Sequence, residues 1–363
     1  MDETTEALLS IGAFARRVGL APSALRFYDD CGVLRPAHVD EVTGYRFYEP
    51  GQEARAGLVR RLREAGLPLV DALVVLDGDE EEARAVLEEH VRRSRDVAVA
   101  AREAAEGILG GSRPASPEAG CGHGARARVG GAEFAGAVRQ VAPAVAAGAE
   151  AQAEFPVLAR VLLELDGPEV RLVATDRFRL AVRTLRAEAA EGGPRQVLVD
   201  VGAMRGLAAR ALREAEVTIE VDQHGVRVRA GDERLPVPVE GGAFPDYRTV
   251  LDGLPPAAHR IITGRDGLRA AVTGRCRGPA VALRTGGERL VVSGAGAVDS
   301  TLRAICTGPP LDVAFDPAVL LGALDVAVGP DVLLECSAPT EPVVVRSADQ
   351  GSFTSLVMPV RRP

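Results

Sequence analysis

The sequence predicts a multidomain chain: an α-helical head, one long helix that can pair with a second copy, and an α+β module of two similar units. Three changes of pattern predict this division. Short helical patterns separated by turns occupy residues 9–77, one uninterrupted helical pattern follows at residues 79–109, and Val, Leu and Ile runs of strand length dominate beyond about residue 127. A length of 363 residues and a hydrophobic content of 47% allow several buried cores.

The head begins with the pattern of a helix-turn-helix. The apolar face of its first helix recurs at helical spacing, at Ile11, Phe14, Ala15 and Val18. Gly19 is typical of a helix end, and Pro22 is typical of the first position of the next helix. We therefore expect residues 23–28 to lie on a short exposed helix that can enter the major groove of DNA.

A β-hairpin wing is predicted after this second helix. The segment HVDEVTGYRFYEP has a turn at Thr43 and Gly44 between two short extended pieces. Tyr45 and Arg46 follow the turn, and a cation on a wing can hold a DNA phosphate. The head is thus predicted to be a winged helix-turn-helix domain, residues 1–78.

Two motifs in the head, SIGAFARRVGLAPSALRFYDDCGVLRP and TGYRFY, are followed by LVRRLREAGLPLVDALVVL. Together they resemble the MerR family of transcriptional regulators over the whole DNA-binding domain. The resemblance implies that Arg26 and its neighbours probe the groove while Tyr45 and Arg46 hold the flanking backbone; Phe27 stands where Tyr is commoner. The DNA-binding candidates are Arg16, Ser23, Arg26, Phe27, Tyr28, Tyr45 and Arg46.

Some of these residues also fit a structural role. We expect about half of four aromatic rings to belong mainly to the core of the small head domain: Phe27, Tyr28, Phe47 and Tyr48. An Arg at the position of Arg26, on the exposed face of the second helix, is usually a DNA contact, and an ordinary solvated side chain is the lesser alternative.

The pattern at residues 79–109 predicts a coiled-coil dimer helix. The seam has 4-3 spacing and small residues that allow close approach, at Leu87, Val91, Ser94, Ala98, Ala101, Ala105 and Ile108. The MerR resemblance implies antiparallel pairing that places two recognition helices on a pseudo-palindromic operator. The alternative is a helix that packs on the core of its own chain.

Residues 110–127 are predicted to be a flexible linker because Gly, Pro, Ser and Ala dominate them, so the head should be a separate domain. The five Cys are scattered without a C-x-x-C pair, which fits a reducing compartment. Cys121 and His123 alone cannot complete the ligand set of a metal, so we predict no metal site and no cofactor.

Two structural repeats are predicted beyond the linker, at residues 128–252 and 253–363. Strand-length runs such as VLLEL, VRLVA, VTIEV, VRVRA, RLVVS and PVVVRS indicate much antiparallel sheet. Each repeat should open with one helix and contain a second, with the opening helices at residues 132–147 and 266–277 and the second helices at 200–214 and 316–328.

Three further motifs stand in order in this module: ATDRFRLAVR at residues 174–183, FPDYRTVL at 244–251 and LVMPVRRP at 356–363. In order and approximate spacing they resemble the second and third domains of the bacterial DNA sliding clamp, the polymerase III beta subunit. The clamp's first domain has no counterpart here, and the head takes its place. The resemblance implies an α+β sliding-clamp-like module of two domains.

In that family the three motifs form a surface cleft that receives short peptides. The resemblance implies an apolar floor at Leu158, Thr175, Leu180, Pro245, Val250, Met358 and Val360. The edge would be Arg177, Phe178, Arg179, Pro359 and Arg361. Such a site suits a peptide with two hydrophobic anchors. From the residues alone, Thr175 and Asp176 fit a strand-end turn, and FPDY fits a loop anchored by aromatic packing.

Charge restricts how this chain can bind DNA. The formal net charge of -8 excludes a protein that coats nucleic acid over its whole surface, so DNA contact must be local. An encircling clamp needs basic inner helices, but Arg139 is the one basic residue in 132–147 and none occurs in 316–328. A working processivity factor is therefore disfavoured.

The sequence also indicates a non-enzymatic, cytoplasmic protein. No catalytic constellation and no phosphate-binding glycine motif occurs, and the acidic pairs fall on solvated helical faces. The N-terminal MDETTEALLS lacks the features of a secretory signal, and no apolar stretch is long enough to span a bilayer.

These features predict a dimeric MerR-type regulator that binds promoter DNA and senses a clamp-binding ligand. Like its family, it would twist or kink the promoter spacer so that RNA polymerase holoenzyme engages both elements, with the signal passing through the dimer helix. The implied ligands are a peptide antibiotic of the griselimycin type or a protein's clamp-binding peptide motif. The alternative from another class is a DNA-tethered module that recruits replication or repair proteins.

Overall fold

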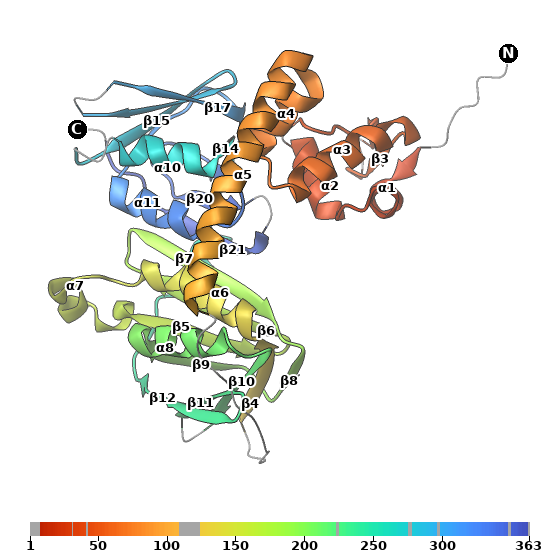
Figure 1. Cartoon of the computed structure of the whole chain (residues 1–363). Helices are drawn as coiled ribbons and strands as arrows, with labels where there is room; N and C mark the ends of the chain where they lie inside the picture. Colours follow the sequence, from red (N-terminus) through yellow and green to blue (C-terminus); the bar gives the residue numbers. More distant parts are fainter. Residues whose placement is uncertain are drawn as a thin grey trace.

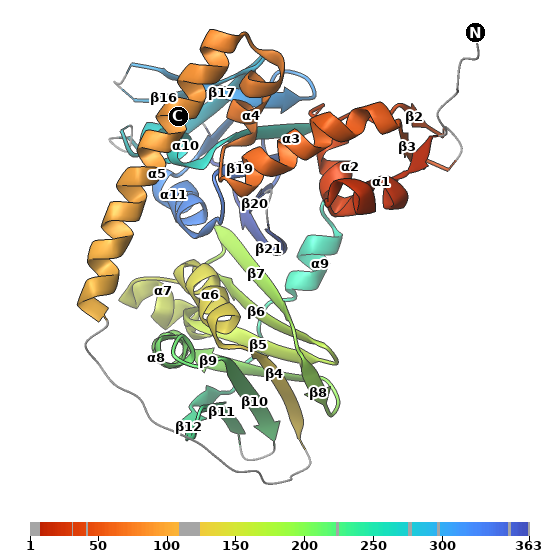
Figure 2. The same cartoon turned by 45° about the vertical axis from the view of Figure 1, so that its right-hand side comes forward.

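The computed structural model describes residues 8–30, 32–40, 43–108, 124–222, 225–274, 278–295, 298–347 and 350–361. Figures 1 and 2 show a small head, a long helix and two sheet-rich units. The predicted fold class is confirmed: a helical head precedes an α+β part rich in antiparallel sheet.

The head contains the predicted helix-turn-helix and wing. Ser10 caps the first helix by accepting a hydrogen bond from the Ala13 amide, and Gly19 ends that helix in the left-handed region at φ 70°. The Phe14 and Tyr48 rings stack in the core with centroids 4.6 Å apart. The elements are β1 (Leu9–Ser10), α1 (Ile11–Val18), α2 (Pro22–Asp30), β2 (His38–Val39), β3 (Arg46–Tyr48) and α3 (Glu53–Glu64).

Two further helices follow α3: α4 (Leu69–Asp77), the last helix of the head, and α5 (Glu80–Ile108). The long helix predicted at residues 79–109 is present from Glu80 to Ile108 in the described part of the chain. Leu87, Val91 and Ser94 of its predicted seam are exposed. The side chains of Ala98, Ala101, Ala105 and Ile108 lie outside the described part of the chain.

The first repeat contains both predicted helices. Its elements are β4 (Ala125–Gly130), α6 (Gly131–Val141), α7 (Ala149–Glu154), β5 (Arg160–Asp166), β6 (Glu169–Thr175), β7 (Arg179–Arg186), β8 (Ala189–Glu191), β9 (Arg195–Asp200), α8 (Val201–Ala211), β10 (Glu216–Asp222), β11 (Gly225–Ala230), β12 (Glu233–Val237), β13 (Val239–Glu240) and α9 (Tyr247–Asp252). Residues 125–127, expected in the linker, instead pair with β10. Their apolar positions complete the core of this repeat.

The second repeat contains β14 (His259–Gly264), α10 (Arg265–Thr273), β15 (Val281–Gly286), β16 (Arg289–Gly294), β17 (Ser300–Thr307), β18 (Asp312–Phe315), α11 (Pro317–Val326), β19 (Asp331–Cys336), β20 (Val343–Ser347) and β21 (Gln350–Val357). Asp316 caps α11 by accepting from the amides of Ala318 and Val319.

One continuous sheet joins the two repeats. Among the described residues it has 13 strands, in the order β13-β9-β5-β6-β7-β21-β20-β19-β14-β17-β16-β15-β18. The junction is the antiparallel pair of β7 and β21, in which Leu180 faces Leu356. Helices α6, α8, α10 and α11 lie on one side of the molecule, and α9 and the head lie on the other, which we call the outer face (Figure 2).

The head packs on the outer face of the second repeat, which corrects the expectation of a separate head. Ile262 of β14 and Leu333 of β19 belong to the same apolar cluster as Phe14 and Leu69 of the head region. Arg63 forms an ion pair with Asp331, and both side chains are buried. The sequence gives no local sign of this contact because its partners are 268 residues apart.

In the described part of the chain, no helix combines the length and the apolar character needed to span a bilayer.

Candidate functional site

The predicted DNA-reading residues of the head lie mostly on its surface. Ser23 and Arg26 of α2 are exposed, as is Arg16 of α1. Tyr45, just before β3 in the wing, is 64% exposed. A short helix beside a hairpin with accessible polar and cationic side chains can contact both groove and backbone of DNA.

Arg46 is engaged within the head itself. Its guanidinium donates to the Asp29 carboxylate at 2.6 Å and to that of Asp30 at 3.3 Å. The hydrogen bond to Asp29 raises the pKa of Arg46, with a further contribution from the charge of Asp30. The residue expected to hold a phosphate therefore also fastens the wing to the end of α2.

The four aromatic rings divide as the sequence suggests. Tyr28 and Tyr48 are buried in the apolar cluster of the head, whereas Phe27 and Phe47 are half-buried. The Tyr28 ring, predicted as a DNA contact, thus lies in the core, with Phe27 tilted against it at 5.9 Å between centroids. Burial follows from helical spacing, since Leu25 and Tyr28 share the inward face of α2.

The clamp-like motifs meet on the outer face of the sheet. Thr175 faces Leu180 across β6 and β7, and Leu180 faces Leu356 across β7 and β21. The amide of Met358 donates to the carbonyl of Phe178 at 2.8 Å, which joins the end of the chain to the β6–β7 turn. Segments about 180 residues apart in sequence are thereby neighbours.

The β6–β7 turn has a tightly bonded, strained backbone. The Asp176 carboxylate accepts from the amides of Phe178 and Arg179 at 3.0 and 2.9 Å. Arg177 has φ 80°, a left-handed conformation that is uncommon outside glycine. Its guanidinium lies 4.6 Å from the centroid of the Phe155 ring. The turn leaves Phe178 60% exposed.

Three exposed apolar side chains belong to the predicted ligand residues: Phe178, Val250 at 48% exposure and Met358 at 37%. Leu158 and Leu180 are buried, so they can only form a floor. Pro245 and Arg361 are exposed, and Pro359 and Val360 are intermediate. We call Phe178, Leu180, Val250 and Met358 the candidate peptide site.

Arg179 does not lie at the rim as predicted. Its side chain is bonded to the Asp176 carboxylate at 2.8 Å and to the carbonyl of Pro143. Its guanidinium also lies against Gly322 of α11, where a Cβ would overlap it and the Arg179 side chain would have to move. Arg179 is therefore bonded within the first repeat and contacts the second repeat at Gly322.

Helix α9, which carries Val250, is fastened to the sheet by a buried carboxylate that the sequence analysis missed. Glu164 of β5 accepts from the Tyr247 hydroxyl at 2.5 Å, from Arg248 at 2.9 Å and from Gln196 at 2.6 Å. Burial, and then the bond to Glu164, raise the pKa of Tyr247 to about 12. The available signal was a lone Glu within the apolar run VLLEL.

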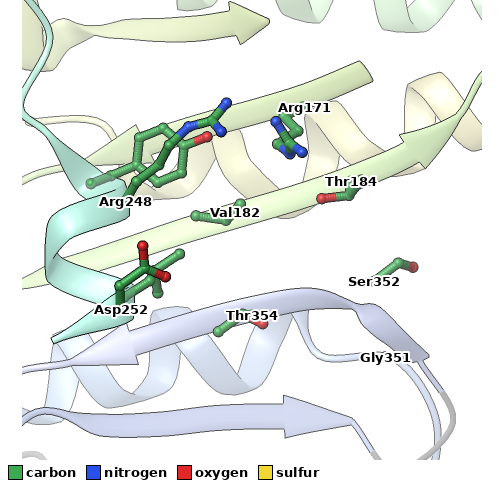
Figure 3. Close-up of a pocket in the computed structure, with 10 residues that line it drawn as sticks. Arg171, Val182, Thr184, Arg248, Asp252, Gly351, Ser352 and Thr354 are labelled. Atoms are coloured by element: carbon green, nitrogen blue, oxygen red, sulfur yellow. The ribbon is translucent and has the colours of Figure 1, made fainter. Parts of the chain in front are cut away.

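A pocket of about 510 Å³ lies on the outer face between α9, β7 and β21 (Figure 3). Val182 and Thr184 of β7 and Thr354 of β21 form its floor, and Arg248 and Asp252 of α9 stand at its side. Its lining includes none of the predicted ligand residues, whereas a second pocket, of about 540 Å³, includes Pro245.

Two cysteines, Cys306 and Cys336, lie in the described part of the chain with free thiols. Burial raises the pKa of the Cys306 thiol to about 11 and also raises that of Cys336. The described part of the chain holds no group of three or more His, Cys, Asp or Glu suited to a metal. Cys121 and His123 lie outside it.

Comparison with known families identifies two different matches along the chain. The model of the MerR HTH family regulatory protein matches residues 9–78. The model of the DNA polymerase III beta subunit, central domain, matches residues 129–246. Each covers less than half of the chain.

Curated relatives divide in the same way. A beta sliding clamp of Pseudomonas aeruginosa is 29% identical over 213 residues, covering 55% of this chain and 57% of the relative. The beta sliding clamp homolog GriR of Streptomyces muensis is 32% identical over 204 residues, 53% of each chain. The multidrug-efflux transporter 1 regulator of Bacillus subtilis is 26% identical over 171 residues, 47% of this chain and 49% of the relative. The chain thus spans about half the length of the curated relatives it matches.

Solved structures agree on the fold of the second part. The DNA polymerase III subunit beta of Pseudomonas aeruginosa superposes with a TM-score of 0.60 at 26% identity, over 69% of this chain and 70% of that chain. A DnaN sliding clamp of the same organism, solved bound to griselimycin, has a TM-score of 0.60 at 24% identity over 68% of each chain.

Proposed function

We propose that this chain, in which a MerR helix-turn-helix domain is joined to a sliding-clamp-like fold, is a dimeric transcriptional regulator that senses a clamp-binding peptide. The head would bind promoter DNA, α5 would pair two copies, and the candidate peptide site would take the ligand. The role is non-catalytic and belongs in the cytoplasm, where promoter DNA and RNA polymerase holoenzyme are available.

The observation that carries the proposal is the group of exposed apolar side chains at the candidate peptide site. Phe178 and Met358 are exposed and are joined by the bond between the Met358 amide and the Phe178 carbonyl. Val250 is exposed on α9, whose Tyr247 packs in the same apolar cluster as Leu180. Exposed apolar residues gathered at one place mark binding surfaces. The griselimycin complex of a similar clamp supports a cyclic peptide as the ligand class.

The inner helices argue against DNA encirclement. Arg269 of α10 is paired with Asp325 of α11 at 2.5 Å, and Arg210 of α8 is paired with Glu233. A groove of about 470 Å³ between α6 and α8 is lined mainly by Ala, Gly, Val and Leu, with two Arg among them. DNA held by phosphate attraction needs a field of available cations, so this surface suits a receptor better than a sliding ring.

A binding and transcription experiment tests the proposal. Griselimycin at a hundredfold excess over its dissociation constant should stabilise the folded protein by about 2.7 kcal/mol, visible as a thermal shift. The same addition should change transcription from the cognate promoter. Met358→Arg should abolish the shift because it places a charge on the apolar wall of the site. It should leave ligand-free DNA binding intact.

Val298→Arg is the matched control, since Val298 is an exposed apolar residue of the same module. It should behave as the wild type in both assays. No thermal shift with griselimycin or with clamp-binding peptides would reject the sensor. Binding without any change in transcription would favour the DNA-tethered recruiter instead.

A further inference from the structure

Helix α4 lies on the outer face of the second repeat, and Asp331 holds its beginning. The amide of Leu69, the first residue of α4, donates to both carboxylate oxygens of Asp331, at 2.9 and 3.0 Å. Arg63 of α3 pairs with the same carboxylate and also donates to the carbonyl of Leu67 at 2.8 Å. One buried carboxylate of the clamp-like module thus satisfies the start of α4 and the end of α3 together.

The contact is made at the turn between α3 and α4, which we call the α3–α4 corner. Ile262 and Leu333 of the sheet pack with Leu69, and Leu73, Leu76 and Ile305 border the same cluster. Arg303 of β17 lies 3.9 Å from the carboxylate of Asp71 on α4. Apolar burial, charge pairing and a helix cap therefore coincide at one interface, which indicates a defined orientation of the head.

The same corner determines the direction of the dimer helix. Helix α4 connects α3 of the head to α5, and the imidazole Nε2 of His90 in α5 lies 2.8 Å from the carbonyl of Ala65 at the corner. In a dimer, the spacing of two recognition helices must match half-sites about one helical turn of DNA apart. A change at the corner would alter that spacing.

A row of residues opposite one another on successive strands runs from the candidate peptide site to this interface. Neighbours across successive strands of the outer face are Thr175 and Leu180, Leu180 and Leu356, Leu356 and Val344, and Val344 and Glu335. Glu335 also pairs with Arg260 at 3.2 Å and with Arg346 at 3.5 Å. Asp331, Leu333 and Glu335 alternate along β19, so the end of the row is on the strand that holds the head.

We propose that the outer face of β14, β17 and β19 is the docking surface for the α3–α4 corner of the head, with Asp331 as its positioning residue. Ligand binding at the candidate peptide site alters operator affinity through this contact. The dimer helix is then not the sole route of the signal. The regulatory part of this inference rests on the proposed function, whereas the docking part does not.

The coupling is tested with the full chain, operator DNA defined by footprinting, and griselimycin. The ratio of operator affinities with and without griselimycin measures the coupling between the two sites. In the wild type this ratio should be about fivefold or more. Asp331→Asn should bring this ratio within about twofold of unity while griselimycin affinity without DNA stays within about twofold. Asp325→Asn, which removes a surface pair with Arg269, is the matched control and should retain the wild-type ratio.

Hydrogen exchange tests the docking without any ligand. The Leu69 amide should be strongly protected in the wild type and should exchange at least tenfold faster in Asp331→Asn. Should Asp331→Asn fail to fold, Arg63→Gln, which leaves the Leu69 cap in place, should still lower the coupling ratio. An unprotected Leu69 amide in the wild type, or full coupling in both variants, would overturn the proposal. If griselimycin does not bind but the Leu69 amide is protected, the proposed sensor function is rejected and the docking surface is retained.

Discussion

Replacing Glu164 by Gln should release α9 from the sheet. The carboxylate accepts three hydrogen bonds, from Tyr247, Arg248 and Gln196, and its side chain is 2% exposed. Charge-assisted bonds contribute about 1.5–3 kcal/mol and neutral ones about 0.5–1.5. The substitution keeps the shape but removes the charge. The bond to Arg248 counts for little, because that side chain is 46% exposed.

The expected loss is about 2 kcal/mol in the free energy of opening α9, or about a thirtyfold higher opening constant. Hydrogen exchange of the α9 amides measures this directly, because local opening controls their exchange. Glu169→Gln is the control, since Glu169 pairs with Arg171 while 44% exposed. Tyr247→Phe should cost about 1 kcal/mol in the wild type and little in the Glu164→Gln background. Equal α9 exchange in the wild type and Glu164→Gln would refute the assignment of Glu164 as the anchor.

Three further outcomes are expected. Arg26→Ala should cost about 1–3 kcal/mol in operator affinity and relax specificity, whereas Arg46→Ala should weaken binding to all DNA sequences alike and flatten its salt dependence. Footprinting and salt titration distinguish the two effects, and unchanged DNA affinity in both variants would contradict the assignment. Val91→Asp with Ala98→Asp should give monomers in sedimentation, because unpaired carboxylates across a seam cost several kcal/mol; an intact dimer would place the interface elsewhere. Burial, with a smaller contribution from Asp29, raises the pKa of Tyr48 to about 12 from an ordinary 10, so the free energy of unfolding should fall as pH rises from 10 to 12. In urea titrations at alkaline pH, Tyr48→Phe should lack the part of this fall that is due to Tyr48, and the same pH profile in both proteins would contradict the prediction.

Local patterns predicted the elements well because they depend on neighbours in sequence. The period of apolar residues located α1, α5 and the strands, and Gly19 and Pro22 located helix ends correctly. The paired motifs also identified both folds. Two features belong to the clamp-like fold as a whole: the order of strands in one continuous sheet and the β7–β21 junction. The sequence of a single segment does not predict them.

The missed features are all contacts between distant segments. Asp331 starts a strand and gives no sign of its role, because its partners Arg63 and Leu69 come from another part of the chain. The direction of the Arg179 side chain follows from its bond to the Pro143 carbonyl, 36 residues away in sequence. The Arg46 ion pair depends on the approach of the wing to Asp29. Such pairings arise from tertiary packing, which residue spacing does not report.

The order of synthesis gives the Asp331 contact a consequence for the newly made protein. Arg63 leaves the ribosome 268 residues before Asp331. At a rate of synthesis of about 5–20 residues per second, β19 is made roughly 15–50 s after the α3–α4 corner that packs against it. During that interval the start of α4 lacks its acceptor, and the apolar side of Leu69 lacks Ile262 and Leu333. The correctly oriented head is thus a property of the finished chain, so a prematurely terminated copy would compete poorly for the promoter.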